Sequence, residues 1–164
     1  MRHFIAFALV VATALAAALS AGAGGATAQS PTKSWTGTWN GNLTIIGTCE
    51  SGALLIVESA TGQMQHTGKT AWSDTYCMDP LTWTASGTAG VYTAANGDEI
   101  HVQMSLQVMW TSPDGGTWSD TETIISGTGR FATASGSNHT EGTFTFTSPT
   151  TEFWDGTTTG TLSY

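Results

Sequence analysis

Apolar and polar residues alternate regularly along residues 99–111. Large apolar side chains occupy every second position: Ile100, Val102, Met104, Leu106, Val108 and Trp110. Alternation with a period of two predicts a β-strand that has one buried face. The segment lies between two turn sequences, Asn96-Gly97 and the Ser-Pro-Asp-Gly-Gly run at 112–116. We therefore predict that residues 117–125 form the next strand and complete a hairpin.

Similar but weaker patterns predict six further strands. They cover Ser34–Thr48, Ala53–Ser59, Gln63–Tyr76, Leu81–Thr93, Asn138–Thr147 and Thr151–Tyr164. In the third of these, the residues expected to share one face are Met64, His66, Gly68, Trp72 and Tyr76. In the fourth, they are Leu81, Trp83, Ala85, Gly87, Ala89 and Val91.

Eight strands with short connections predict an all-β protein. Residues 29–164 show no helical periodicity, and they suffice for one domain with a core but not for two. Eight is about the number of strands at which an antiparallel barrel closes around its own side chains or one small ligand. Closure also removes the exposed edges of a threonine-rich sheet. We therefore predict an eight-stranded antiparallel barrel, to which a two-sheet sandwich is the alternative.

The first 28 residues have the pattern of an export signal. Arg2 provides a short basic region, residues 4–19 are apolar, and Ala26-Thr27-Ala28 matches the A-x-A cleavage pattern. We interpret residues 1–28 as a signal peptide and residues 29–164 as a single barrel domain, secreted or periplasmic in a bacterium. A membrane anchor is the alternative, although the apolar run is short for a bilayer.

The charge of the domain excludes one class of partner. Without Arg2, the strong cations are Lys33, Lys69 and Arg130, against twelve carboxylates, so the net charge is −9 with histidine neutral. Phosphate binding requires clustered lysine and arginine, so binding to nucleic acid is excluded and binding to anionic lipid is disfavoured. The acidity is most simply a solubility device.

Cys49 and Cys77 are the only cysteines in the chain. In an exported protein two cysteines favour a disulfide, because the compartment is oxidising. Two free thiols or a pair of metal ligands are the competing interpretations, but the spacing is not the C-x-x-C of a zinc site.

Residues 126–136 read SGTGRFATASG, a glycine-rich turn that holds Arg130 and Phe131 between its glycines. The segment resembles the turn of the allene oxide cyclase and dirigent barrels and of small secreted bacterial proteins with that barrel. The matching residues are Gly127, Thr128, Gly129, Phe131, Ala134 and Gly136, whereas Ser126 and Thr133 replace glycines and Ser135 stands where dirigent proteins often have arginine. The resemblance implies an allene oxide cyclase-like, calycin-like barrel with a rigid cavity that folds a reactive apolar substrate. We interpret Arg130 itself as structural, bonding loop carbonyls or an acidic neighbour.

A second, shorter likeness lies in the first predicted strand. Gly37-Thr38-Trp39 resembles the G-x-W signature of lipocalins and avidins. Both families also have meandering barrels whose interior can hold a small molecule, so this likeness implies the same architecture.

Tryptophans and in-phase polar residues are the candidates for function. The predicted ligand-binding residues are Trp39, Trp83, Trp110, Trp118 and Glu122. Core packing is the alternative role of these rings. If Trp118 and Ile124 face the interior, then Asp120 and Glu122 do too, and a carboxyl group in an apolar barrel could act as a general acid or base. His66 is a similar candidate; for each of the three polar residues, exposure to solvent is the alternative.

No metal or cofactor site is predicted. His101 is expected to face solvent, and His139 and Glu141 share a strand face but lack a recognisable third ligand. The chain has no G-x-S-x-G, phosphate-loop or H-E-x-x-H motif, so hydrolase and nucleotide-binding functions have no support.

Large rings and small residues share the same strands. Trp39, Trp83 and Trp110 lie near glycine or alanine at positions 41, 85, 87 and 89. This combination predicts a concave apolar pocket at one end of the barrel, with Glu122 as its polar group.

We therefore hypothesise a secreted, cofactor-free barrel that binds a small, mainly apolar molecule, and we favour binding over catalysis. One alternative is a cyclase or isomerase that uses Glu122, Asp120 or His66. Another is a structural, self-associating extracellular protein, which a filled interior would favour.

Overall fold

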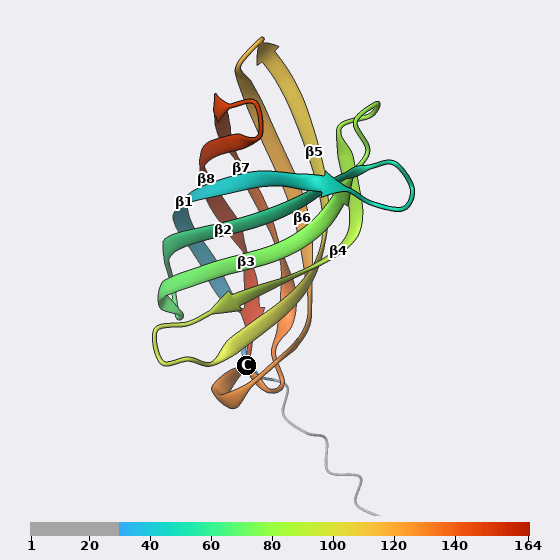
Figure 1. The fold of residues 1–164 in the computed structure, drawn as a ribbon. Helices are drawn as coiled ribbons and strands as arrows, with labels where there is room; N and C mark the ends of the chain where they lie inside the picture. Colours follow the sequence, from blue (N-terminus) through green and yellow to red (C-terminus); the bar gives the residue numbers. More distant parts are fainter. Residues whose placement is uncertain (1–29) are drawn as a thin grey trace, which may run out of the picture.

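Eight antiparallel strands close into a barrel in the computed structural model, which describes residues 30–164 (Figure 1). The strands are β1 (Lys33–Thr48), β2 (Leu54–Met64), β3 (Gly68–Met78), β4 (Thr84–Thr93), β5 (Glu99–Ser112), β6 (Gly115–Gly127), β7 (Ser135–Ser148) and β8 (Thr151–Ser163). Each strand pairs with the next, and β8 pairs with β1 from Lys33↔Leu162 to Thr44↔Thr151. The predicted barrel is confirmed, and the sandwich is wrong because this last pairing leaves no open edge.

The predicted signal peptide at residues 1–28 lies outside the described residues. Within residues 30–164, no helix is long and apolar enough to cross a membrane.

The turn between β2 and β3 lies inside the segment that we predicted to be the third strand. β2 continues to Met64, and residues 65–67 form the turn before β3 starts at Gly68. His66 adopts a left-handed backbone with φ of 67°. Non-glycine residues rarely take this conformation. Because residues 65–67 contain no glycine or proline, nothing in them indicates a turn. His66 is exposed, so its predicted place on the inner face is wrong.

A bulge in β4 changes which residues of that strand face inward. The pairing with β5 shifts between Ser86 and Thr88, where Gly87 has φ of +69°. One inserted residue moves every later side chain to the opposite face. Ala85 is therefore buried as predicted, but beyond the bulge the buried positions are Thr88, Gly90 and Tyr92 rather than Ala89 and Val91.

One end of the barrel is filled with apolar side chains. Trp35 near the start of β1, Ile100 near the start of β5, Phe131 between β6 and β7, and Leu162 near the end of β8 have no exposed surface. The end of β8 marks the end of the barrel that carries the C-terminus (Figure 1). Phe131 comes from the short 3₁₀ turn η1 (Gly129–Phe131), which follows β6 in the predicted glycine-rich turn. Its ring meets the edge of Tyr164 at a centroid distance of 4.9 Å. We refer to this end as the closed end.

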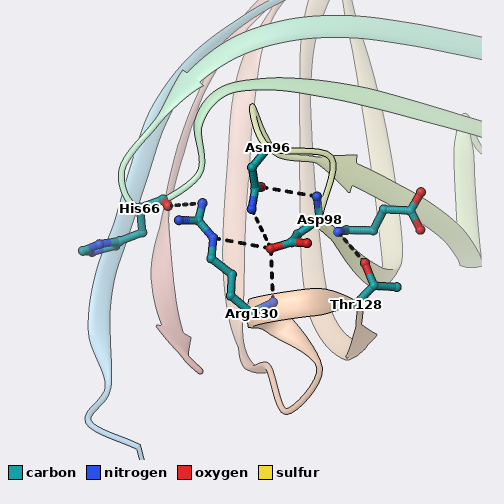
Figure 2. A network of polar contacts seen from close by, with 6 residues as sticks. His66, Asn96, Asp98, Thr128 and Arg130 are labelled. Carbon is teal, nitrogen blue, oxygen red and sulfur yellow. Dashed lines mark hydrogen bonds and ion pairs between the residues drawn. The ribbon is translucent and has the colours of Figure 1, made fainter.

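Arg130 joins three loops across the closed end (Figure 2). Its guanidinium donates a hydrogen bond of 2.8 Å to the carbonyl oxygen of His66 in the β2–β3 turn. Its backbone N–H donates to a carboxylate oxygen of Asp98, between β4 and β5, at 3.1 Å. Asn96 donates to the same oxygen at 2.7 Å. The predicted structural role of Arg130 is thus confirmed, and we call this network the loop latch.

A disulfide between Cys49 and Cys77 joins the β1–β2 loop to the end of β3, with a Cα–Cα distance of 6.2 Å. The predicted disulfide is confirmed. β1 and β3 both run away from the closed end, so the bridge and the loop latch fasten opposite ends of the barrel.

The disulfide is expected to stabilise the barrel through the unfolded chain. The Cys49→Ser/Cys77→Ser double variant should lower the free energy of unfolding by roughly 3.5 kcal/mol, because the bridge closes a loop with a sequence separation of 28. Guanidinium denaturation measures the change. Reductant should lower the free energy of unfolding of the parent protein to the same extent and leave that of the double variant unchanged. Equal denaturation midpoints for the parent and the double variant in the absence of reductant would contradict the expectation.

The loop latch is expected to contribute less. Arg130→Ala removes the bond to His66 and the contact of 3.9 Å with Asp98, which should cost about 1 kcal/mol because the network is exposed. Thermal unfolding of Arg130→Ala is compared with that of Lys69→Ala, which removes an exposed cation of β3. If the two variants lose equal stability, the latch has no role beyond its charge.

Candidate ligand cavity

A narrow cavity runs through the barrel interior beyond the closed end. It contains about 550 Å³ that no atom fills, its mouth included, but only about 40 Å³ is open to the centre of a water molecule. The residues that line it are Trp39, Leu43, Glu58, Trp72, Tyr76, Tyr92, Met104, Leu106, Val108, Trp118, Asp120, Glu122, Thr140, Glu152 and Trp154. The small second volume shows that the side chains leave little room inside the cavity.

Three rings form the floor of the cavity. The centroid of Tyr92 lies 4.5 Å from that of Trp72 and 5.4 Å from that of Trp39. All three residues are buried and line the cavity, and we call them the aromatic floor. Trp35 packs against the other side of this group, 5.1 Å from Tyr92, and connects it to the closed end.

Glycines make room for the tryptophan rings. A Cβ atom added to Gly90 would collide with Trp72, one added to Gly41 would collide with Trp154, and one added to Gly156 would collide with Trp118. The rings therefore lie over the backbone and fill the space that the missing side chains leave. The prediction was that rings beside glycines leave a concave apolar pocket; here the rings fill much of the space beside the glycines, which explains why the cavity is small.

Hydrogen bonds fix several polar groups around the floor. The Tyr92 hydroxyl lies 2.7 Å from both carboxyl oxygens of Glu122. The indole N–H of Trp39 donates to Thr158 at 2.9 Å, and Thr158 in turn bonds to Thr140 at 2.8 Å. The backbone N–H of Thr140 donates to Asp120 at 3.2 Å. These contacts hold the floor and β6 in one arrangement.

Five acidic side chains point into the interior, and we call them the carboxylate array. They are Glu58, Asp74, Asp120, Glu122 and Glu152. None of the salt bridges among residues 30–164 involves any of them. Acidic groups that are buried without cations carry an energetic cost, so their presence requires an explanation other than stability.

Burial raises the pKa of every member of the array. The pKa of Glu122 rises to about 7, although the Tyr92 hydrogen bond lowers it in part. The pKa of Asp74 rises to about 8, first through burial and then through the charge of Glu122. Burial alone raises the pKa of Glu152 to about 7. For Glu58 and Asp120, burial and neighbouring carboxylates raise the pKa well above its ordinary range.

Asp74 differs from the others because both of its carboxyl oxygens are fully buried without a hydrogen-bond partner among the described residues. Only 8% of the residue is exposed. It lies on the inner face of β3 between Trp72 and Tyr76. A buried polar group of this kind normally has a partner, and Asp74, whose neighbours Trp72 and Tyr76 line the cavity, does not line it itself.

Four of the predicted functional residues line this cavity. They are Trp39, Trp118, Asp120 and Glu122. The alternative that Asp120 and Glu122 face solvent is wrong, because their exposed fractions are 7% and 3%. His66 instead lies on the β2–β3 turn, where its ring nitrogen is 3.0 Å from the carbonyl oxygen of Ser34. His66 does not line the cavity, so the prediction that it is an interior candidate like Asp120 and Glu122 is wrong.

Trp83 and Trp110 do not line the cavity but belong to an aromatic cluster near the opposite end from the loop latch. The centroid of Trp110 is 5.0 Å from Trp83, 5.2 Å from Phe144 and 5.5 Å from Phe146. Trp83 precedes β4 with φ of 55°, so it is not a strand residue. The prediction that these two rings line the pocket is therefore wrong, and they instead pack against each other.

Sequence reasoning missed Tyr92 and three members of the array. The residues are Glu58, Asp74, Tyr92 and Glu152. A signal existed for Asp74 and Glu152, since each lies two residues from a tryptophan on an alternating strand. Tyr92 gave no such signal because the β4 bulge inverts its face.

Metal ligands do not gather in the described part of the chain. No group of three or more histidine, cysteine, aspartate or glutamate residues among residues 30–164 could hold a metal ion. His101 is half-buried and contacts Glu99 at 2.9 Å, and His139 lies 3.7 Å from Glu141.

No protein-family model, curated protein or solved structure matches the chain.

The raised pKa values are expected to make the barrel less stable as the pH rises. Between about pH 4 and pH 8 the native state holds protons that the unfolded chain has released, so the free energy of unfolding falls with pH. Each such proton contributes at most about 1.4 kcal/mol per pH unit. Thermal unfolding should occur at a higher temperature at pH 5 than at pH 8.

Asp74→Asn should flatten this dependence, because one group that must lose its proton is removed. Glu141→Gln is the matched control, since Glu141 is exposed on the outer face of β7. A melting temperature that is constant or rises between pH 5 and pH 8 would contradict the interior placement of these acids.

Proposed function

We propose that this protein binds a small molecule inside its barrel, with the apolar part of the ligand against the aromatic floor. The observation that carries the proposal is that one cavity combines this floor with four acidic side chains, those of Glu58, Asp120, Glu122 and Glu152, none of which forms a salt bridge among the described residues. Binding cavities commonly pair apolar walls with a few fixed polar groups that orient the ligand.

The composition of the interior favours this function over a purely structural one. A barrel that served only as a support would gain stability from aliphatic residues in place of Glu58, Asp74 and Glu152. Departures from the most stable core are expected at functional sites. The filled closed end supplies the apolar core that such a departure requires.

Export to an oxidising compartment is part of the proposal. The Cys49–Cys77 disulfide is typical of such compartments, and the pattern of residues 1–28 supports the same location. We keep the likeness to the allene oxide cyclase barrel as an expectation about the type of cavity.

Catalysis is the second candidate function, and Glu122 is the observation that favours it. Its pKa of about 7 suits a general acid or base at neutral pH, and the Tyr92 hydroxyl beside it could donate a hydrogen bond to a substrate oxygen. The reaction class would be a proton-transfer isomerisation or cyclisation without a cofactor, with Asp120 on the same strand face as a further candidate.

Blocking the cavity should abolish binding. Leu106 lines the cavity, whereas Met109 on the same strand is 63% exposed. Leu106→Trp should prevent the quenching of tryptophan fluorescence by small ligands, and Met109→Trp should not. The panel for titration contains a neutral, an anionic and a cationic alkyl compound. If no compound binds the parent protein, or if Leu106→Trp binds as well as the parent, the proposal fails; circular dichroism checks that both variants fold.

A further inference from the structure

Ser126, His101 and Glu99 form a chain of hydrogen bonds on the outer surface of the barrel. The Oγ atom of Ser126 lies 3.2 Å from Nδ1 of His101, and Nε2 of the same ring lies 2.9 Å from a carboxylate oxygen of Glu99. A nucleophile, a base and an acid that orients the base have this order in a catalytic triad. Triads are recognised by geometry rather than by sequence motif, so the lack of a G-x-S-x-G motif in the chain does not exclude one.

Two features of the strands bring these side chains together. Glu99 and His101 lie on either side of the buried Ile100 in β5, so both are on the outer face of that strand. Ser126 is paired with His101 across β5 and β6, at a place where the register shifts because Ile125 is an extra residue of β6. Bulges of this kind redirect side chains and are frequent beside active sites.

The loop after β6 holds the backbone of Glu99 in place. The backbone N–H of Glu99 donates a hydrogen bond of 2.8 Å to the Thr128 hydroxyl, and the backbone N–H of Thr128 donates to the carbonyl oxygen of Glu99 at 2.9 Å. Thr128 lies beside the loop latch (Figure 2). The acid therefore extends from a backbone that is fixed on both sides, as a residue that must orient a neighbouring ring requires.

The two contacts of the His101 ring determine which of its nitrogens carries the proton. A carboxylate only accepts hydrogen bonds, so Nε2 is the donor to Glu99. In the neutral ring Nδ1 is then an acceptor, and the Ser126 hydroxyl donates to it. In serine proteases Nε2 faces the serine and Nδ1 faces the acid. Here the two nitrogens are exchanged, which leaves the direction of proton transfer the same.

The surroundings of Ser126 restrict the type of substrate. Ser126 is exposed, and Ile125 beside it has 57% of its surface exposed. On the other side of His101, its half-buried cross-strand partner on β4 is Val91. These aliphatic neighbours suit a short apolar acyl group. Because the site lies on an open surface rather than in a water-excluded cleft, stabilisation of an oxyanion is weak there, and the substrate requires a good leaving group.

We propose that Ser126 is a catalytic nucleophile that accepts the acyl group of activated esters, with His101 as its general base and Glu99 as the positioning residue. The Oγ atom of Ser126 forms a bond to the carbonyl carbon of the ester, and its proton moves to Nδ1 of His101. The bond from that carbon to the leaving oxygen then breaks, and the leaving group departs as an anion with the electron pair. Glu99 stabilises the imidazolium that results.

The acyl-serine is returned to the free enzyme by water. The imidazolium first loses its proton to solvent, and the neutral His101 then takes a proton from the attacking water. The carboxylic acid leaves, and the proton returns to the Ser126 hydroxyl. This activity is separate from the ligand binding proposed above, because none of the three residues lines the interior cavity.

Peptide mapping by mass spectrometry after incubation with p-nitrophenyl acetate tests the proposal. The acetyl group is expected on Ser126, and the absorbance of p-nitrophenolate follows the rate of its transfer. Ser105 is the internal control, because it is exposed on the outer face of β5. The hydrogen bonds of the histidine rings among residues 30–164 do not involve Ser105, so it should remain unmodified.

The general base is tested by a matched pair of histidine variants. His101→Gln should slow the acetylation of Ser126 about 100-fold, the lower end of what a general base contributes. His139→Gln should leave the rate unchanged. His139 also lies beside a glutamate on an outer strand face, 3.7 Å from Glu141, but its ring contacts no serine hydroxyl among the described residues. Circular dichroism checks that both variants fold.

Glu99→Gln tests the positioning role. It should slow the acetylation by at least about tenfold, because the acid holds the ring in the reactive tautomer. Nitrogen NMR of isotope-labelled histidine reports that tautomer directly, and the His101 signal is assigned by its loss in His101→Gln. The proton should reside on Nε2 in the parent and less completely so in Glu99→Gln. A role of Glu99 in stability alone would lower the melting temperature and leave the tautomer and the rate unchanged.

Three results would overturn the proposal. The first is acetyl groups on lysine or histidine side chains but not on Ser126. The second is equal acetylation of Ser126 and Ser105, which would show that any exposed serine reacts. The third is an unchanged rate of Ser126 acetylation in His101→Gln. None of these results bears on ligand binding in the cavity, which the fluorescence titrations with Leu106→Trp test independently.

Discussion

The pairing of β8 with β1 is the constraint on which the rest of the structure depends. Once the sheet closes, every second side chain of every strand must enter the same interior, whatever its chemistry. The cavity is shared between the six aromatic rings and the four acids that line it, and each glycine beneath a ring determines how close that ring comes to the backbone. Closure therefore fixes both the shape of the cavity and the burial of its charges.

The two ends of the barrel differ in what they contribute to stability. The closed end buries Trp35, Ile100, Phe131 and Leu162 completely, and the loop latch holds the connections around them. The other half contains the acids that weaken it. The disulfide lies in this second half, at the end of β3, where a covalent bond offsets the cost of the buried acids. Stability is thus concentrated outside the ligand cavity.

The architecture could be predicted from the sequence because alternation and turn residues act locally. The β5–β6 hairpin and the number of strands follow from residues that are near one another in the chain. The site could be predicted only in part. Asp120 and Glu122 keep the phase of Trp118, so their inward direction was visible, but the bulge at Gly87 inverts Tyr92 and the turn at His66 lacks a glycine or proline at its centre. Neither a single inserted residue nor a left-handed non-glycine residue can be recognised from the alternation of apolar and polar residues.

The interior acids make the net negative charge of the folded protein smaller than the formal count. A formal count assigns one negative charge to each of twelve carboxylates, yet the raised pKa values keep part of the buried five in the acid form at neutral pH. The folded protein is therefore less anionic than its own unfolded chain, and it holds a store of protons that unfolding releases. In an electric field at pH 7 the native barrel carries a smaller charge than its composition implies, and the difference reports how many of the interior carboxyl groups remain protonated.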